Sequence, residues 1–173
     1  MPELTLVIGR DEIQRQVSKI AEAISRDYRG RELVMIGVLK GAFLFLADLA
    51  RQVRLEKISI DFLQASSYGA DTLSSGKIIL KKDIDVDVRG KDVLVIEDIV
   101  DTGLTLSHLI DHLQGFKPAS VKVCAVIDKR ERRKTDIRID YVGSVMEKGF
   151  LVGYGLDYAE TYRNLPDIYQ MKL

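Results

Sequence analysis

The sequence predicts an α/β fold with a mostly parallel central sheet flanked by helices. Short apolar runs typical of strands alternate along the chain with segments whose apolar residues repeat at helical spacing. The run over residues 33–39 is continuously apolar, as expected of a strand that helices cover on both faces. The chain has 173 residues, of which 46% are apolar, so it can bury a core. We therefore expect a single domain over residues 1–173.

Each element has its own signal in the sequence. Apolar residues at helical spacing predict a first helix that Asp11 would cap and Gly30 would end. Residues 66–76 are small and polar and predict a loop, and Pro166 lies in a segment expected to be irregular. Further helices are expected at residues 41–50 and 104–113. Strands are expected at residues 33–39, 57–65, 77–80, 93–96 and 121–127, with short strands within 139–156.

The charge balance argues against a polyanionic partner. The 26 basic and 26 acidic residues cancel, and the isoelectric point is about 6.7, so we expect no nucleic-acid partner. No apolar run approaches the roughly 20 residues that cross a bilayer, so we expect no membrane partner. The first residues do not resemble a signal peptide, which predicts a cytoplasmic protein. The single cysteine, Cys124, is expected to be a buried, reduced thiol.

The most informative stretch is residues 93–105, where an apolar strand leads into three carboxylates and a Thr/Gly turn. Ligands of open α/β sheets bind at the carboxyl ends of strands, and a turn into a helix binds anions. Glu97 and Asp98 suit a ribose diol together with Mg²⁺, and Asp101 suits a proton acceptor. On residue types alone, an acidic loop with a capping Asp or Thr remains the alternative. The chain contains neither GxxxxGK[ST] nor GxGxxG.

Residues 93–103 resemble the phosphoribosyl-pyrophosphate (PRPP) signature of type I phosphoribosyltransferases. Residues 39–41 resemble the pyrophosphate loop of the hypoxanthine-guanine branch of that family, and residues 66–76 resemble its mobile loop. Residues 128–130 and 150–158 resemble its purine pocket. These blocks, followed by Arg163, come in the family's order along the chain.

The resemblance implies a type I phosphoribosyltransferase fold, with a small hood subdomain and a mobile loop, and a purine salvage activity. Such an enzyme moves the 5-phosphoribosyl group of PRPP to N9 of hypoxanthine or guanine, giving IMP or GMP and pyrophosphate. By resemblance, Glu97 and Asp98 would hold the ribose hydroxyls and Mg²⁺, and Asp101 would accept the purine N7 proton. The 5′-phosphate would lie in a cradle formed by Asp101, Thr102, Gly103, Leu104 and Thr105.

Further roles come from the flanking blocks. By resemblance, Lys40, Gly41 and Arg163 would contact pyrophosphate, with a non-proline cis peptide between Leu39 and Lys40. In the purine pocket Lys129 would donate to O6, Phe150 would stack on the ring, the Leu151 backbone would face the base edge and Asp157 would hold Mg²⁺. Ser67 and Tyr68 would belong to the mobile loop. The family also implies a homodimer or homotetramer.

One segment departs from the family pattern. Glu147-Lys148-Gly149 precedes Phe150 where the family commonly has Pro-Asp-Glu or Pro-Asp-Lys, which leaves the preference among hypoxanthine, guanine and xanthine open. A regulator of the same fold that senses PRPP or a nucleotide is one alternative, and a phosphoribosyltransferase that prefers xanthine or another base is a second. In the basic run after Lys129, residues 132–134 are expected to form a solvated face.

Overall fold

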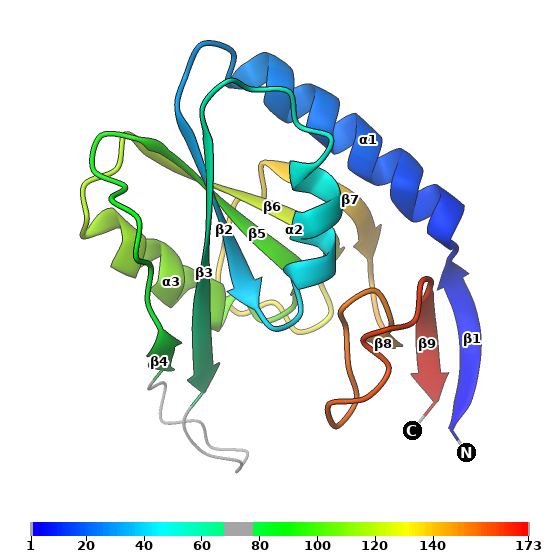
Figure 1. Cartoon of the computed structure of the whole chain (residues 1–173). Coiled ribbons are helices and arrows are strands. Elements are labelled where there is room, and N and C mark those ends of the chain that lie inside the picture. The colour runs from blue at the N-terminus through cyan, green and yellow to red at the C-terminus, as the bar shows by residue number, and fades with distance from the viewer. Residues whose placement is uncertain (1, 68–77, 173) are drawn as a thin grey trace.

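The structure is a computed structural model that describes residues 2–67 and 78–172. Within these residues, three helices and two sheets make up the fold (Figure 1). The helices are α1 (Arg10–Asp27), α2 (Phe43–Ala50) and α3 (Leu104–Gln114). The strands are β1 (Glu3–Ile8), β2 (Leu33–Leu39), β3 (Ile58–Ser67), β4 (Ile78–Lys82), β5 (Asp92–Val100), β6 (Ser120–Lys129), β7 (Tyr141–Met146), β8 (Phe150–Val152) and β9 (Ile168–Lys172).

The larger sheet confirms the predicted α/β class. Its strand order is β4-β3-β2-β5-β6-β7. Every neighbouring pair from β3 to β7 is parallel, and β4 is antiparallel to β3. Strand β2 has the predicted bounds and is hydrogen-bonded on both edges, by β3 and β5. Because these strands are parallel, their carboxyl ends gather at one edge of the sheet, where ligands of such folds bind.

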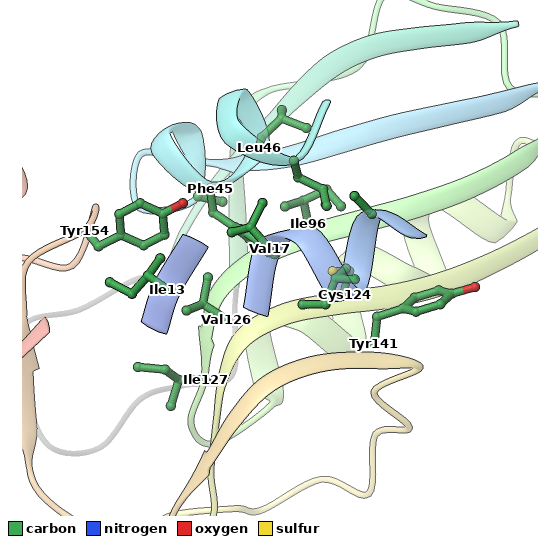
Figure 2. Packing of buried hydrophobic residues seen from close by; sticks show 14 of the residues in the cluster. Ile13, Val17, Phe45, Leu46, Ile96, Cys124, Val126, Ile127, Tyr141 and Tyr154 are labelled. Carbon is green, nitrogen blue, oxygen red and sulfur yellow. The ribbon is translucent and has the colours of Figure 1, made fainter. Parts of the chain in front are cut away.

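Helices cover both faces of this sheet, and successive side chains of β2 point alternately to the two faces. Leu33 and Met35 belong to the core that α1 and α2 cover, whereas Val34 and Ile36 belong to the core beneath α3. Figure 2 shows α1 and α2 side chains meeting strand residues such as Ile96 and Cys124. Fully burying such a side chain contributes roughly 1.5–3 kcal/mol. Cys124 is buried, as predicted.

The sequence predicted only part of the smaller sheet. Its antiparallel order β1-β9-β8 joins the two ends of the chain, and β8 follows β7 closely (Figure 1). The expectation of an irregular tail around Pro166 is therefore wrong beyond Asp167, because Ile168–Lys172 pairs with both β1 and β8. This sheet is the hood that the family resemblance implied.

Two predicted boundaries need correction. The N-cap of α1 is Gly9 and makes no side-chain cap, so Asp11 lies in the first turn, where its charge favours the helix dipole. Strand β5 does not end at Ile96 but runs to Val100. Its pairing with β2 stops at Ile96, while its pairing with β6 continues to Val100. The acids of the motif therefore lie on a strand end that is free on one edge.

None of the described helices is long and apolar enough to cross a membrane.

The buried carboxylate of Asp61 fixes the connection between β4 and β5. Its Oδ2 accepts the backbone N–H groups of Asp85 at 2.6 Å and Val86 at 3.0 Å, and Oδ1 accepts that of Phe62 at 2.7 Å. Burial acts to raise the pKa of Asp61, but these hydrogen bonds and the Lys82 ammonium outweigh it and hold the pKa below its usual value.

We predict that Asp61→Asn lowers the free energy of unfolding by about 1–3 kcal/mol, because an amide leaves buried N–H donors unpaired. Urea unfolding at pH 7 measures this difference. The pKa of Asp61 in the folded protein lies below its unfolded value of about 3.9. The stability advantage of the wild type is therefore complete above about pH 3.9 and is lost as the pH falls through the folded pKa. A difference that stays constant down to pH 2 would contradict this explanation.

Candidate active site

Two other segments of the chain approach the backbone of Gly41, which lies in the turn between β2 and α2. The Asp98 carboxylate at the end of β5 lies so close that a Cβ at position 41 would be 1.8 Å from its Oδ2. Gly155, with φ +97°, lies equally close, since its own Cβ would be 2.0 Å from the Gly41 carbonyl oxygen. Glycine is therefore required at both positions for this approach. The expected cis peptide between Leu39 and Lys40 is present just before the turn.

A small cavity lies where β5 turns into α3. It has a volume of about 140 Å³ and is lined by Glu97, Ile99, Val100, Asp101, Thr102, Gly103, Thr105 and Leu106. Gly103 is the N-cap of α3, with φ +82° and no side chain to cap the helix. The Leu104 N–H makes only a long contact of 3.4 Å with the Thr102 hydroxyl, which a stronger acceptor such as a phosphate could replace. Free N–H groups at the positive end of a helix dipole bind phosphate. Of the residues predicted to hold the 5′-phosphate, Asp101, Thr102, Gly103 and Thr105 line this cavity and Leu104 does not.

The adjacent carboxylates of Glu97 and Asp98 carry an electrostatic cost in this structure. Burial, and then repulsion by Asp98, raises the pKa of Glu97 well above its usual value. Burial likewise raises the pKa of Asp98, against the opposing effects of hydrogen bonds from Glu97 and the backbone and, last, of the Arg163 charge. Protein cations therefore do not fully compensate this pair, and a bound cation or hydroxyl donors would stabilise its charged form.

Asp101 and Lys129 face each other at the ends of β5 and β6. Lys129 Nζ lies 3.8 Å from Asp101 Oδ2, and the lysine side chain is only 8% exposed. Arg132 approaches the same oxygen at 3.7 Å. The other oxygen, Asp101 Oδ1, is buried and has no hydrogen-bond partner among the residues that the structure describes. A buried oxygen without a partner costs free energy that a ligand proton would recover, so this atom is ready to accept one.

The segment after β8 completes the site with an ion-pair network. Arg163 lies 3.0 Å from Asp157 and 3.2 Å from Glu160, and it donates to the Gly155 carbonyl oxygen at 2.7 Å. Lys40 reaches Glu160 at 2.6 Å from the other side. The structure thus joins Lys40, Arg163 and Asp157, as the sequence predicted. It adds Glu160, to which the sequence gave no role.

Phe150 and Leu151, the residues expected to face the purine, lie in β8. The Phe150 ring is 38% exposed and meets the ring of Tyr158 edge to face, with centroids 5.7 Å apart. Leu151 is buried and pairs with Gln170 in the smaller sheet. Tyr158 packs against the Phe150 ring, and the sequence analysis gave it no separate role within residues 150–158.

Comparison with known proteins shows the family of this chain. The family described as phosphoribosyl transferase domain matches residues 9–159. The chain belongs to the phosphoribosyltransferase family. A hypoxanthine-guanine phosphoribosyltransferase of Aquifex aeolicus is 45% identical over 171 residues, which cover 98% of this chain and 96% of that protein. The enzyme of the same name from Bacillus subtilis is 44% identical, covering 96% and 92%.

Solved structures of the family have the same fold. A hypoxanthine-guanine phosphoribosyltransferase from Bacillus anthracis superposes with a TM-score of 0.92 at 48% identity, covering 98% of this chain and 99% of that one. A hypoxanthine phosphoribosyltransferase from Staphylococcus aureus gives a TM-score of 0.93 at 40% identity, covering 97% and 91%.

A magnesium ion is compatible with this phosphoribosyltransferase site. In residues 2–67 and 78–172, no three His, Cys, Asp or Glu side chains gather as a metal centre. Mg²⁺ usually takes only one or two carboxylates from a protein, however, and completes its shell with water and substrate phosphates. Glu97 and Asp98 could supply those carboxylates, since burial raises the pKa of both and a bound cation would stabilise their charged forms. Asp157 could contribute a further oxygen if Arg163 moved away from it.

The loop assigned to Ser67 and Tyr68 is only partly described. Ser67 is the last residue of β3, and its backbone is paired with Ile78 of β4. Tyr68 lies outside the described residues, and so does the rest of the loop up to residue 77.

Arg133 is a residue of this phosphoribosyltransferase that the sequence reasoning placed wrongly. It was expected on a solvated face, but its side chain is only 21% exposed. The guanidinium donates to the carbonyl oxygens of Asp101 at 2.9 Å, Val100 at 3.1 Å and Lys129 at 3.2 Å, and it pairs with the Asp128 carboxylate. Arg133 therefore ties the end of β5 to the end of β6. Arg132, at 66% exposed, fits the expectation.

We predict that Arg133→Met lowers the free energy of unfolding by about 1–3 kcal/mol, because it leaves the Asp128 carboxylate and three carbonyl oxygens without their donor. Urea unfolding measures the loss. The matched control is Arg132→Met, which removes the same charge one residue away and should change stability by less than about 0.5 kcal/mol. Equal effects of the two substitutions would show that Arg133 is not the clamp.

Proposed function

We propose that this protein is a purine salvage enzyme that transfers the 5-phosphoribosyl group of PRPP to N9 of hypoxanthine or guanine. The products are IMP or GMP and pyrophosphate. The observation that carries the proposal is the position of Asp101 and Lys129, an acceptor and a donor 3.8 Å apart beside a helix N-terminal cradle. The names of the Aquifex and Bacillus relatives support the same reaction.

Asp101 and Lys129 act on two different atoms of the purine. In the reaction the C1′–O bond to pyrophosphate breaks, the N9–C1′ bond forms, and the purine loses a proton from N7. Asp101 accepts that proton, for which its unpaired Oδ1 is suited. Lys129 donates to the purine O6, and because an ammonium has donors only, it favours a 6-oxo group over the 6-amino group of adenine.

Glu97 and Asp98 act on the ribose. They accept hydrogen bonds from its hydroxyl groups, and their negative charge stabilises the positive charge that develops on the ring in the transition state. Interactions that are stronger in the transition state than in the ground state raise the rate. Mg²⁺, when bound through these carboxylates and Asp157, supplies positive charge that offsets the charge of the pyrophosphate group.

The remaining predicted residues bind and enclose the substrates. Thr102–Thr105 hold the 5′-phosphate, and Lys40, the Gly41 backbone and Arg163 contact pyrophosphate. Phe150 stacks on the purine ring and the Leu151 backbone faces its edge, while the loop with Ser67 and Tyr68 excludes water. We also propose a cytoplasmic homodimer or homotetramer, on the family resemblance alone.

We predict that the protein, incubated with Mg²⁺ and PRPP, converts hypoxanthine and guanine to their nucleotides and leaves adenine unreacted. Separate reactions with hypoxanthine, guanine, xanthine and adenine, followed by chromatography of the products, measure this selectivity. A preference for xanthine would correct the choice of base, whereas the absence of nucleotide from every base would favour the regulator that only senses PRPP.

We further predict that Asp101→Asn lowers kcat by about 10²–10⁴-fold, because an amide cannot accept the N7 proton as a base. The affinity for PRPP should change little, since the helix N-terminus that binds the phosphate is unaltered. Steady-state kinetics and calorimetric titration with PRPP separate the two effects. Unchanged turnover would rule out Asp101 as the base.

A further inference from the structure

The Glu160 carboxylate occupies the two cations assigned to pyrophosphate. Its Oε2 accepts from Lys40 Nζ at 2.6 Å, and its Oε1 accepts from an Arg163 terminal nitrogen at 3.2 Å. Carboxylates and phosphates present similar charged oxygens to ammonium and guanidinium groups. The protein therefore supplies an anion of its own to the very groups that would receive the leaving group.

The backbone around Glu160 is shaped for this contact. Tyr158 and Thr161 exchange backbone hydrogen bonds of 3.1 and 3.0 Å, which closes a tight turn over Ala159 and Glu160. Both central residues have positive φ, +49° and +65°, a turn in which Asn and Gly are strongly preferred. A glutamate at this position goes against the backbone preference. The side-chain contacts of Glu160 with Lys40 and Arg163 compensate for this unfavourable backbone conformation.

The pair of cations keeps Glu160 in its charged form. Hydrogen bonds from Lys40 and then from Arg163 lower the pKa of the Glu160 carboxyl below its usual value. Asp157 anchors the arrangement, because it accepts the Glu160 backbone N–H at 2.9 Å and pairs with Arg163. The Lys40 and Glu160 side chains are 54% and 63% exposed, so solvent can enter and the contact can exchange for another anion.

We propose that Glu160 is a positioning residue that stands in for pyrophosphate. Glu160 pairs with Lys40 and Arg163 in the free protein. These contacts break when the pyrophosphate group of PRPP binds, and they form again as pyrophosphate dissociates. This inference rests on the proposed function and deepens it. Glu160 competes with pyrophosphate for the same donors and adds a like charge beside it, so it weakens pyrophosphate binding and favours product release.

The test is calorimetric titration with inorganic pyrophosphate in the presence of MgCl₂. Glu160→Gln removes the charge and keeps the shape, and Glu160→Asn removes it with a residue that tolerates positive φ. Because exposed ion pairs are weak, both variants should bind pyrophosphate about threefold more tightly than the wild type. GMP, which lacks the pyrophosphate group, should bind with unchanged affinity.

The matched control is Glu32→Gln, which makes the same change of charge at the amino ends of β2 and β5. Glu32 pairs with Lys91 at 3.1 Å, away from the site, and its substitution should leave pyrophosphate affinity unchanged. Unchanged or weaker pyrophosphate binding by both Glu160 variants would overturn the inference, and so would an equal gain in GMP affinity. If the wild type neither binds pyrophosphate nor forms nucleotide from any base, the proposed function itself fails.

Discussion

Close packing at Gly41 sets the geometry of the whole site. A side chain at position 41 would collide with the Asp98 carboxylate of β5, and a side chain at position 155, in the segment after β8, would collide with the Gly41 carbonyl oxygen. Because atoms in these contacts have little room to shift, Asp98, the turn at Gly41 and the segment that carries Arg163 are fixed relative to one another. Substrate groups can then be held in a reactive arrangement without further ordering of the protein.

This close packing has an electrostatic consequence. Glu97 and Asp98 lie side by side on the strand end that β2 no longer covers, and burial raises the pKa of both. In a core, such a pair would be destabilising, because neighbouring buried carboxylates repel each other. In the proposed function the ribose hydroxyls and Mg²⁺ would give the same pair its partners. Relief of this unfavourable interaction would then contribute to the affinity for the ligand.

The sequence predicted what depends on local pattern and missed what depends on distant pairing. Both ends of strand β2 were predicted correctly, because a continuous apolar run is typical of a buried parallel strand in an α/β chain. Strands β1 and β9 were missed because each is short and is stabilised by the other, more than 150 residues away. Arg133 and Glu160 were missed for the same reason. The sequence shows an ordinary charged residue, and only the folded chain brings its partners to it.

The clamp made by Arg133 bears on the proposed chemistry. The guanidinium donates to the carbonyl oxygens of Asp101 and Lys129 at once, so the two residues share a single support. In the proposed reaction Asp101 would accept the N7 proton and Lys129 would donate to O6, and N7 and O6 belong to one rigid purine. A 6-oxopurine bound to Lys129 would then present N7 to Asp101, whereas a base without the 6-oxo group would lose the contact with Lys129. On this proposal, base selection and proton transfer both depend on the way Arg133 holds the end of β5 to the end of β6.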